Sequence, residues 1–227
     1  MGETNSCDIA KTDCCQIAIT IQNMAEIVDR LVIAVEGVEP GWVVLSRSEL
    51  SLFPQDQAPV RLTLAPPAGS ESRAGTYELS VHVTSQESPA ERTTLPLTLE
   101  VAALSAFEAA LRPQMQSGLK EGIFTLHLSN GGNSDLAVSL SASDPEDGCT
   151  YGFSTVRTPL PAGQERLVQI TVRPKVPRAP QGGKTYSFTV VARPEELPQQ
   201  VKQVKGQWQQ IGPRRRRRWP LVAGLLA

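Results

Sequence analysis

One order of motifs occurs twice in this chain, and this repeat constrains the fold more than any other feature of the sequence. The stretch GIFTLHLSNGGNSD corresponds to CQIAITIQNMAEIVD, PAGQERLVQITVRP to PQDQAPVRLTLAPP, and GKTYSFTVVARPEELP to AGTYELSVHVTSQESP. The offset stays between 107 and 109 residues, as the pairs Tyr77 with Tyr186 and Pro54 with Pro161 illustrate. A nearly constant offset across ordered motifs predicts two copies of one domain.

Apolar and polar residues alternate within both copies, as in QIAITIQN and TYELSVHVTS. Period two is the pattern of half-buried strands, and Gly and Pro, which occupy 35 of 227 positions, separate the runs. We therefore predict an all-β fold of two tandem immunoglobulin-like β-sandwiches. The residues expected in the two cores are Trp42, Leu62, Leu64, Leu79 and Val81 in the first, and Leu126, Leu128, Ile170, Val172, Phe188 and Val190 in the second.

The motif order VEGVEPGWVVLS, LSLFPQDQAPVRLTLAPP, ESRAGTYELSVHVTSQ and LSASDPEDGCTYGF resembles tandem bacterial immunoglobulin-like domains related to the alpha-galactosidase-associated family. The resemblance covers roughly 15–210 and implies sandwich domains of the kind found in uncharacterised bacterial membrane proteins, followed by a hydrophobic segment. The domains expected are an N-terminal tail (1–14), sandwich 1 (15–103), sandwich 2 (104–212) and a polybasic flank with a truncated hydrophobic segment (213–227).

Five consecutive arginines near the C-terminus give the clearest signal for placement. Without Arg214, Arg215, Arg216, Arg217 and Arg218, the chain has 17 basic and 23 acidic residues, a net charge of −6, so the body carries no electrostatic footprint for nucleic acid. Trp219 and an apolar run follow, which is the pattern of a membrane flank with an interfacial anchor. Only nine residues remain from Trp219 to Ala227, whereas a spanning helix needs roughly 20, so we expect a fragment that ends inside its transmembrane helix.

The positive-inside rule then predicts that the sandwiches lie on the cytoplasmic side, with the cell surface as the alternative. The N-terminus lacks the charged and apolar regions of a secretory signal peptide. Cys7, Cys14 and Cys15 cluster at one end and Cys149 stands alone, so no pattern of bridges within domains emerges and a reducing compartment is the simpler interpretation.

The sequence offers two tryptophans and two histidines as candidate ligand-binding residues. Trp42 follows a turn and offers a sugar-stacking surface, but a Trp at a strand start in a sandwich more often fills the core, and Trp208 receives the same interpretation. His82 and His127 fall one per copy without a second ligand at metal spacing, so surface-facing strand positions explain both.

The acidic turn SDPEDG offers Asp144, Glu146 and Asp147 as calcium ligands, but its spacing departs from a calcium loop after Pro145, so a solvated turn is favoured. NGGN at 130–133 lacks the following helix of a phosphate loop, and no nucleophile elbow or Cys/His pair is present in the sequence. We therefore expect no enzyme, no cofactor and no metal.

The function expected is a non-catalytic module of a membrane-anchored bacterial protein that acts as a spacer or protein-interaction scaffold. The membrane, through the C-terminal segment, and an unidentified protein are the expected partners. The alternative is an extracellular carbohydrate-binding or adhesion accessory module, which the fold permits by analogy.

Overall fold

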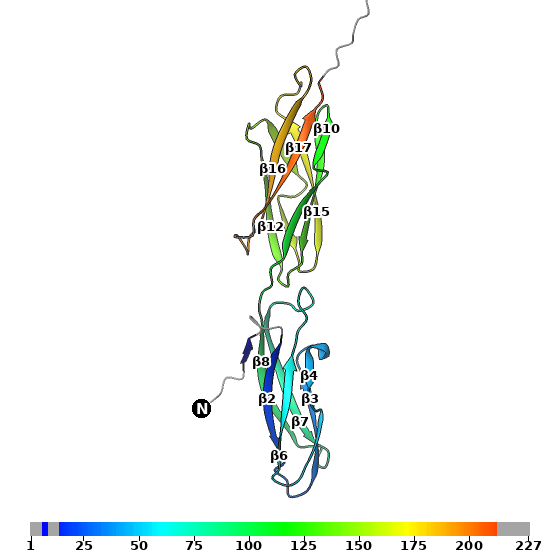
Figure 1. Ribbon diagram of the computed structural model, residues 1–227, viewed down its shortest axis with the longest axis vertical. Coiled ribbons are helices and arrows are strands. Elements are labelled where there is room, and N and C mark those ends of the chain that lie inside the picture. The colour runs from blue at the N-terminus through cyan, green and yellow to red at the C-terminus, as the bar shows by residue number, and fades with distance from the viewer. Residues whose placement is uncertain (1–5, 9–13, 213–227) are drawn as a thin grey trace, which may run out of the picture. The chain divides into compact units, whose positions relative to one another are not determined.

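A computed structural model describes residues 6–8 and 14–212 of the chain, and the regular secondary structure of these residues is almost entirely β-strand (Figure 1). They fall into two compact units, the first running to Ala106 and including Gly131–Asp135, and the second comprising Phe107–Asn130 and the residues from Leu136 onward. Each unit is a sandwich of two sheets with the strand order of an immunoglobulin-like fold. The all-β immunoglobulin-like fold class expected from the sequence is confirmed.

The first unit has a five-stranded sheet in the order β1-β8-β7-β3-β5 and a three-stranded sheet in the order β2-β6-β4. Its strands are β1 (Ser6–Asp8), β2 (Cys15–Gln22), β3 (Asp29–Glu36), β4 (Val43–Leu45), β5 (Glu49–Leu52), β6 (Gln57–Leu64), β7 (Gly75–Ser85) and β8 (Arg92–Val101), with a short 3-10 turn η1 (Pro40–Trp42) before β4. Neighbouring strands are antiparallel except for β1, which pairs with β8 in parallel.

The second unit has a five-stranded sheet in the order β10-β17-β16-β12-β14 and a four-stranded sheet in the order β13-β15-β11-β9. Its strands are β9 (Phe107–Arg112), β10 (Met115–Gly118), β11 (Gly122–Asn130), β12 (Leu136–Ser143), β13 (Cys149–Phe153), β14 (Arg157–Leu160), β15 (Glu165–Pro174), β16 (Lys184–Pro194) and β17 (Lys202–Gln210). Again one short strand, β10, pairs in parallel, with β17. The five-stranded sheets of the two units therefore share one strand order.

Alternation along each strand builds the cores, because every second side chain points between the two sheets. In β7, for example, Leu79 and Val81 are buried while Glu78 is exposed. All the residues predicted for the two cores are buried, and the two apolar clusters have no member in common. Tyr77 and Tyr186 are each the third residue of β7 and β16, which occupy the same place in the two sheet orders.

Glycines allow close backbone approach at specific points in each unit. Gly37 has a φ of +103°, and an added Cβ would lie 2.4 Å from the carbonyl oxygen of Glu78. In the second unit, Cβ atoms at Gly118 and Gly122 would lie 2.4 and 2.5 Å from the ring of Trp208. These two glycines leave the space that the buried indole fills.

Candidate functional site

The predicted membrane flank, Arg214 to Arg218 with Trp219, lies outside the residues that the structure describes. Within 6–8 and 14–212, no helix has the length and apolar character needed to cross a membrane.

Trp42 belongs to the core of the first unit, as predicted, and does not form a surface platform. Its side chain is 6% exposed and packs edge to face with Tyr77, with ring centroids 5.2 Å apart. The Tyr77 hydroxyl donates a hydrogen bond to the Arg73 carbonyl at 2.8 Å, which fixes the ring that covers the indole. Trp208 is 1% exposed, so neither tryptophan presents a face on which a sugar ring could stack.

The acidic turn before β13 is held together by the carboxylate of Asp144. Backbone N–H groups of Gly148 and Cys149 donate to it at 2.7 and 3.1 Å, that of Glu146 at 3.2 Å, and the Tyr151 hydroxyl at 2.8 Å. Burial alone would raise the pKa of Asp144, but these hydrogen bonds outweigh it and lower the pKa below its usual value of 3.8.

The other two carboxylates of this turn form ion pairs with lysines. Asp147 Oδ1 lies 2.6 Å from Lys175 Nζ, and Glu146 Oε2 lies 2.8 Å from Lys184 Nζ. No group of His, Cys, Asp and Glu side chains suited to a metal ion occurs in the part of the chain that the structure describes. The oxygens of the turn accordingly serve the loop itself and its two neighbouring lysines.

Cys149 is a buried thiol beside this turn, and its surroundings oppose nucleophilic chemistry. Burial first and the Asp144 carboxylate second raise the pKa of the Cys149 thiol to about 11. Burial and the hydrogen bond to Asp144 likewise raise the pKa of Tyr151. Because the thiolate is the nucleophile, a buried thiol with a raised pKa is poorly suited to nucleophilic attack.

The state of Cys15 contradicts one expectation about the cysteines. The interpretation of the cysteines as unpaired is wrong for Cys15, which is disulfide-bonded. Disulfides persist in oxidising compartments and are rare in the cytosol, so the cysteines no longer support the expectation of a reducing compartment.

The histidines lie on strands, on the faces turned away from the cores. His82 of β7 contacts Thr94 Oγ1 at 2.9 Å and Glu36 Oε2 at 3.4 Å, and these neighbours reduce the exposure of its side chain to 12%. His127 of β11 is half-buried. The two imidazoles fall in different units and on different strands.

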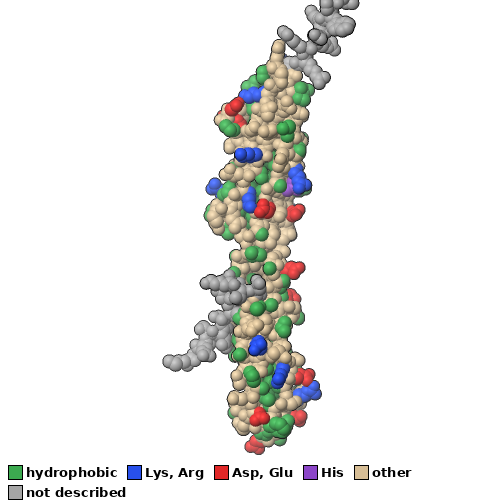
Figure 2. Space-filling view, in the orientation of Figure 1, with side chains coloured by type: hydrophobic (Ala, Val, Ile, Leu, Met, Phe, Trp, Pro, Cys, Tyr) green, Lys and Arg blue, Asp and Glu red, His purple; other side chains and the backbone are tan. Residues whose placement is uncertain are grey.

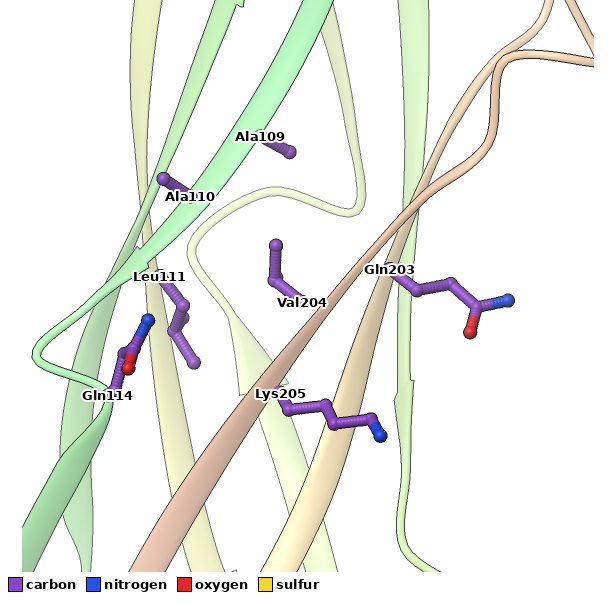
Figure 3. Close-up of a pocket in the computed structure, with 7 residues that line it drawn as sticks. All are labelled: Ala109, Ala110, Leu111, Gln114, Gln203, Val204 and Lys205. Atoms are coloured by element: carbon purple, nitrogen blue, oxygen red, sulfur yellow. The ribbon is translucent and has the colours of Figure 1, made fainter.

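An open hollow of about 350 Å³ lies on the second unit where β9 and β17 come together (Figure 3). It is lined by Ala109, Ala110, Leu111, Gln114, Gln203, Val204 and Lys205. In Figure 3 the Val204 side chain points toward the alanines and Leu111, while Gln203 and Lys205 point away on the other side of the strand. The groups that line the hollow are aliphatic side chains and two amides, and the one amine, that of Lys205, points away from it in Figure 3.

Two buried asparagines are the functional-looking residues that sequence reasoning missed. Asn23, which follows β2, donates from its side chain to the carbonyls of Ile27 at 2.9 Å and Leu52 at 3.0 Å. Asn130, which ends β11, donates to the carbonyl of Leu160 at 3.0 Å. Both asparagines follow or end the first long strand of a sequence copy, and this shared position is the signal that could have identified them.

Acidic and basic side chains are intermixed on the described part of the surface that Figure 2 shows. On the face shown in Figure 2, basic and acidic side chains are scattered singly among neutral ones. Several are matched in pairs, such as Arg157 with Glu195 at 2.6 Å and Lys202 with Glu108 at 2.9 Å. Exposed pairs of this kind contribute little stability and present no extended patch to a polyanion.

No protein-family profile and no curated protein matches the chain. Among solved structures, a protein of unknown function from Porphyromonas gingivalis W83 aligns at 15% identity over 87% of this chain and 91% of its own, with a TM-score of 0.30. The Pseudomonas aeruginosa CupB2 chaperone aligns at 6% identity and covers 90% of this chain and 97% of its own. The D00-D0 domain of Intimin aligns at 13% identity and covers 92% of this chain and 96% of its own. The TM-score is 0.33 in both cases. The sheet orders described above define the class as an immunoglobulin-like sandwich protein, and these likenesses add no argument of their own. The finer resemblance to the alpha-galactosidase-associated family has no profile match behind it.

Proposed function

We propose that the chain is a non-catalytic immunoglobulin-like module of a membrane-anchored bacterial protein, which acts as a spacer or protein-interaction scaffold. One observation carries the non-catalytic part: the side chains best suited to chemistry are committed to the fold. The Asp144 carboxylate closes a turn, the Cys149 thiol is buried with a raised pKa, and His82 packs against Thr94 and Glu36. A protein whose reactive side chains are committed to the fold in this way is suited to contact with other molecules rather than to catalytic turnover.

Membrane anchoring rests on the sequence, through Arg214–Arg218 and Trp219, and the family resemblance adds support to it. Two observations favour opposite sides of the membrane. The arginines before the apolar run favour the cytoplasmic side, whereas the disulfide at Cys15 favours an oxidising compartment and with it the alternative of a cell-surface adhesion module.

Sidedness is tested with the chain extended beyond Ala227 to a complete apolar helix of roughly 20 residues. An impermeant protease is applied to intact cells and to inverted vesicles. Digestion of the sandwiches only in inverted vesicles supports the cytoplasmic scaffold, and replacement of Arg214–Arg218 by Gln should then raise the fraction cleaved from outside.

A matched control replaces five exposed basic residues of the sandwiches by Gln and should leave sidedness unchanged. These control positions are Arg47, Lys120, Arg166, Arg178 and Lys205. Digestion of the unaltered protein from outside intact cells would reject the cytoplasmic scaffold in favour of the cell-surface module.

A further inference from the structure

The edge of β2 is the longest sheet edge in the described part of the chain. β2 spans eight residues, whereas the other seven strands at sheet edges span three to six. On one side β2 pairs with β6 over its full length, and no described strand lies on its other side. A long open edge is a template for pairing with another strand.

Natural proteins protect such edges with charges, prolines or short strands, and β2 has none of these devices. Its sequence, CQIAITIQ, contains no charged residue and no proline. The other edges differ: β9 carries Glu108 and Arg112, β14 carries Arg157 and Pro159, and β4 has only three residues. The β2 edge therefore lacks the features that prevent association.

The backbone groups along this edge point outward in a defined register. The N–H of Arg61 in β6 donates to the Ser46 hydroxyl, and the C=O of Arg61 accepts from the Ser46 N–H. Both backbone groups of Arg61 therefore point toward the β4 side. Its partner across the β2–β6 ladder, Ala18, is therefore in a non-hydrogen-bonded pair and directs its own N–H and C=O away from β6. By alternation, Gln16, Thr20 and Gln22 do the same.

In the second unit a strand occupies the position beside the equivalent of β2. Its strand β11, which pairs with β15 as β2 pairs with β6, has the antiparallel strand β9 on its other side. Phe124, Leu126 and Leu128 of β11 are fully buried. On β2, by contrast, Ile17 and Ile19 remain half-buried. Among the residues that the structure describes, the first unit therefore has no strand in the place that β9 occupies in the second.

The sequence of β2 identifies the strand that fits beside it, which is a second β2. When two β2 strands run antiparallel about a twofold axis at Ile19, Gln16 opposes Gln22, Ile17 opposes Ile21, and Ala18 opposes Thr20. In this register Ala18 and Thr20 form a hydrogen-bonded pair, as their outward backbone groups require. Isoleucines meet isoleucines on the inner face, and no like charges meet because the strand has none.

We propose that the chain forms a homodimer through antiparallel β2–β2 pairing, which joins two three-stranded sheets into one six-stranded sheet. The interface is isologous, since the same residues on both copies exchange the same contacts. The row of Ile17, Ile19 and Ile21 from the second copy covers the half-buried isoleucines of the first, as β9 covers β11. This self-association goes beyond the proposed role of the module.

The test measures the mass of the full chain in solution by light scattering and sedimentation over a range of concentrations. The unaltered protein should be a dimer. The double substitution Ala18→Lys with Thr20→Lys affects two exposed positions, and in the proposed register it sets lysines directly opposite one another. We expect dimerisation to weaken about tenfold or more, because like charges opposed across a sheet repel.

The matched control, Ser88→Lys with Thr93→Lys, adds the same charge to exposed positions of the same unit and should leave the dimer intact. The partner double variant Ala18→Glu with Thr20→Glu should also be monomeric alone. An equimolar mixture of the two double variants should recover a dimer, because opposite charges then face each other in both pairs. Circular dichroism checks that each variant is folded.

A monomeric unaltered protein would overturn the proposal. So would a dimer that both lysine variants leave unchanged or weaken equally, because the contact would then lie on another surface. Failure of the mixture to recover a dimer would reject the register centred on Ile19. These outcomes leave the proposed scaffold role untouched, since that role is tested through sidedness.

Discussion

Asn23 and Asn130 act as side-chain links between the two sheets of their respective units. Each ends the first long strand of its sandwich and donates to a carbonyl at the end of a strand of the opposite sheet, Leu52 of β5 or Leu160 of β14. Each is also 2% exposed, so its amide cannot bond with water instead. A buried polar group is tolerated only when its bonds are made, which explains why an amide of this length occurs at both places.

Replacing Asn130 by Ala should lower the free energy of unfolding by about 1 to 3 kcal/mol, because the carbonyl of Leu160 would lose its donor in a buried environment. Asn23→Ala should have a similar effect on the first unit. Chemical denaturation measures both. Gln164→Ala, at an exposed neighbouring position, is the control and should change stability by less than about 0.5 kcal/mol. Equal effects of Asn130→Ala and Gln164→Ala would contradict the structural role.

Asp144 makes the stability of the second unit dependent on acid pH. Its folded pKa is lowered, so its contribution is present above the unfolded value of 3.8 and is lost as the pH falls through the folded pKa. Asp144→Asn should therefore destabilise the protein at neutral pH, because an amide nitrogen cannot accept the bonds from Cys149 and Tyr151. The difference in unfolding free energy between the two proteins should shrink below about pH 4.

Unfolding free energies measured from pH 2 to pH 7 check this prediction. Asp147→Asn serves as the control, because the Asp147 side chain is 88% exposed and its ion pair with Lys175 contributes little. A difference between the unaltered protein and Asp144→Asn that stayed constant over the whole range would exclude a role for the charge of Asp144.

At the level of elements, sequence reasoning succeeded where the physical signal is strong. Alternation with flanking turn residues predicted the long strands, such as β7 and β16, and their buried residues. The short parallel edge strands β1 and β10 were not foreseen, because SCD and MQSG show no alternation and owe their strand form to pairing with β8 and β17. The sequence copies likewise gave no sign that β9 has no counterpart beside β2 among the described strands.

The turn before β6 and the turn before β15 each contain one residue with a left-handed backbone, and the type of this residue differs between them. Gln55 has a φ of 67° and Gly163 a φ of 73°, and their N–H groups donate to the carbonyls of Asn23 and Asn130 at 2.9 and 2.7 Å. A non-glycine residue in this region costs about 1 to 2 kcal/mol, partly offset by the greater freedom of glycine in the unfolded chain. The first turn therefore carries strain that the second avoids.

Gln55→Gly should raise the stability of the first unit by about 0.5 to 1 kcal/mol, and Gly163→Ala should lower that of the second by about 1 kcal/mol. Thermal unfolding of the two variants against the unaltered protein measures the opposite shifts. Gly41→Ala, at a glycine without a positive φ and with open space for a Cβ, is the control for a simple glycine substitution. Shifts of the same sign at Gln55 and Gly163 would contradict the conformational explanation.

At the scale of the whole molecule, the described residues include the tryptophans and Cys15 but not the arginine block. The interpretation of Trp42 and Trp208 as core residues is confirmed, because both are almost fully buried. The disulfide at Cys15 was missed, since spacing alone does not reveal which cysteines approach each other. The arginine block Arg214–Arg218 lies outside the described residues, so its role as a membrane flank stays a prediction.

The two hydrophobic cores lead to the last prediction, which concerns cooperativity. The apolar clusters share no residue, so each unit has the buried surface of an independent domain. Leu62 and Leu126 are completely buried, one in each core. Leu62→Ala and Leu126→Ala should each reduce the stability of their own unit by about 2 to 5 kcal/mol, through lost burial and the cavity left behind.

Hydrogen exchange read by mass spectrometry locates the effect in the chain. In Leu62→Ala, amides of β2 to β8 should exchange faster while those of β11 to β17 keep their protection, and Leu126→Ala should give the reverse. Exposed Leu167→Ala is the control and should leave both units protected, since its side chain lies largely in solvent. If either core substitution accelerated exchange equally in both units, the sandwiches would unfold as one cooperative body, and a spacer built from separable domains would be excluded.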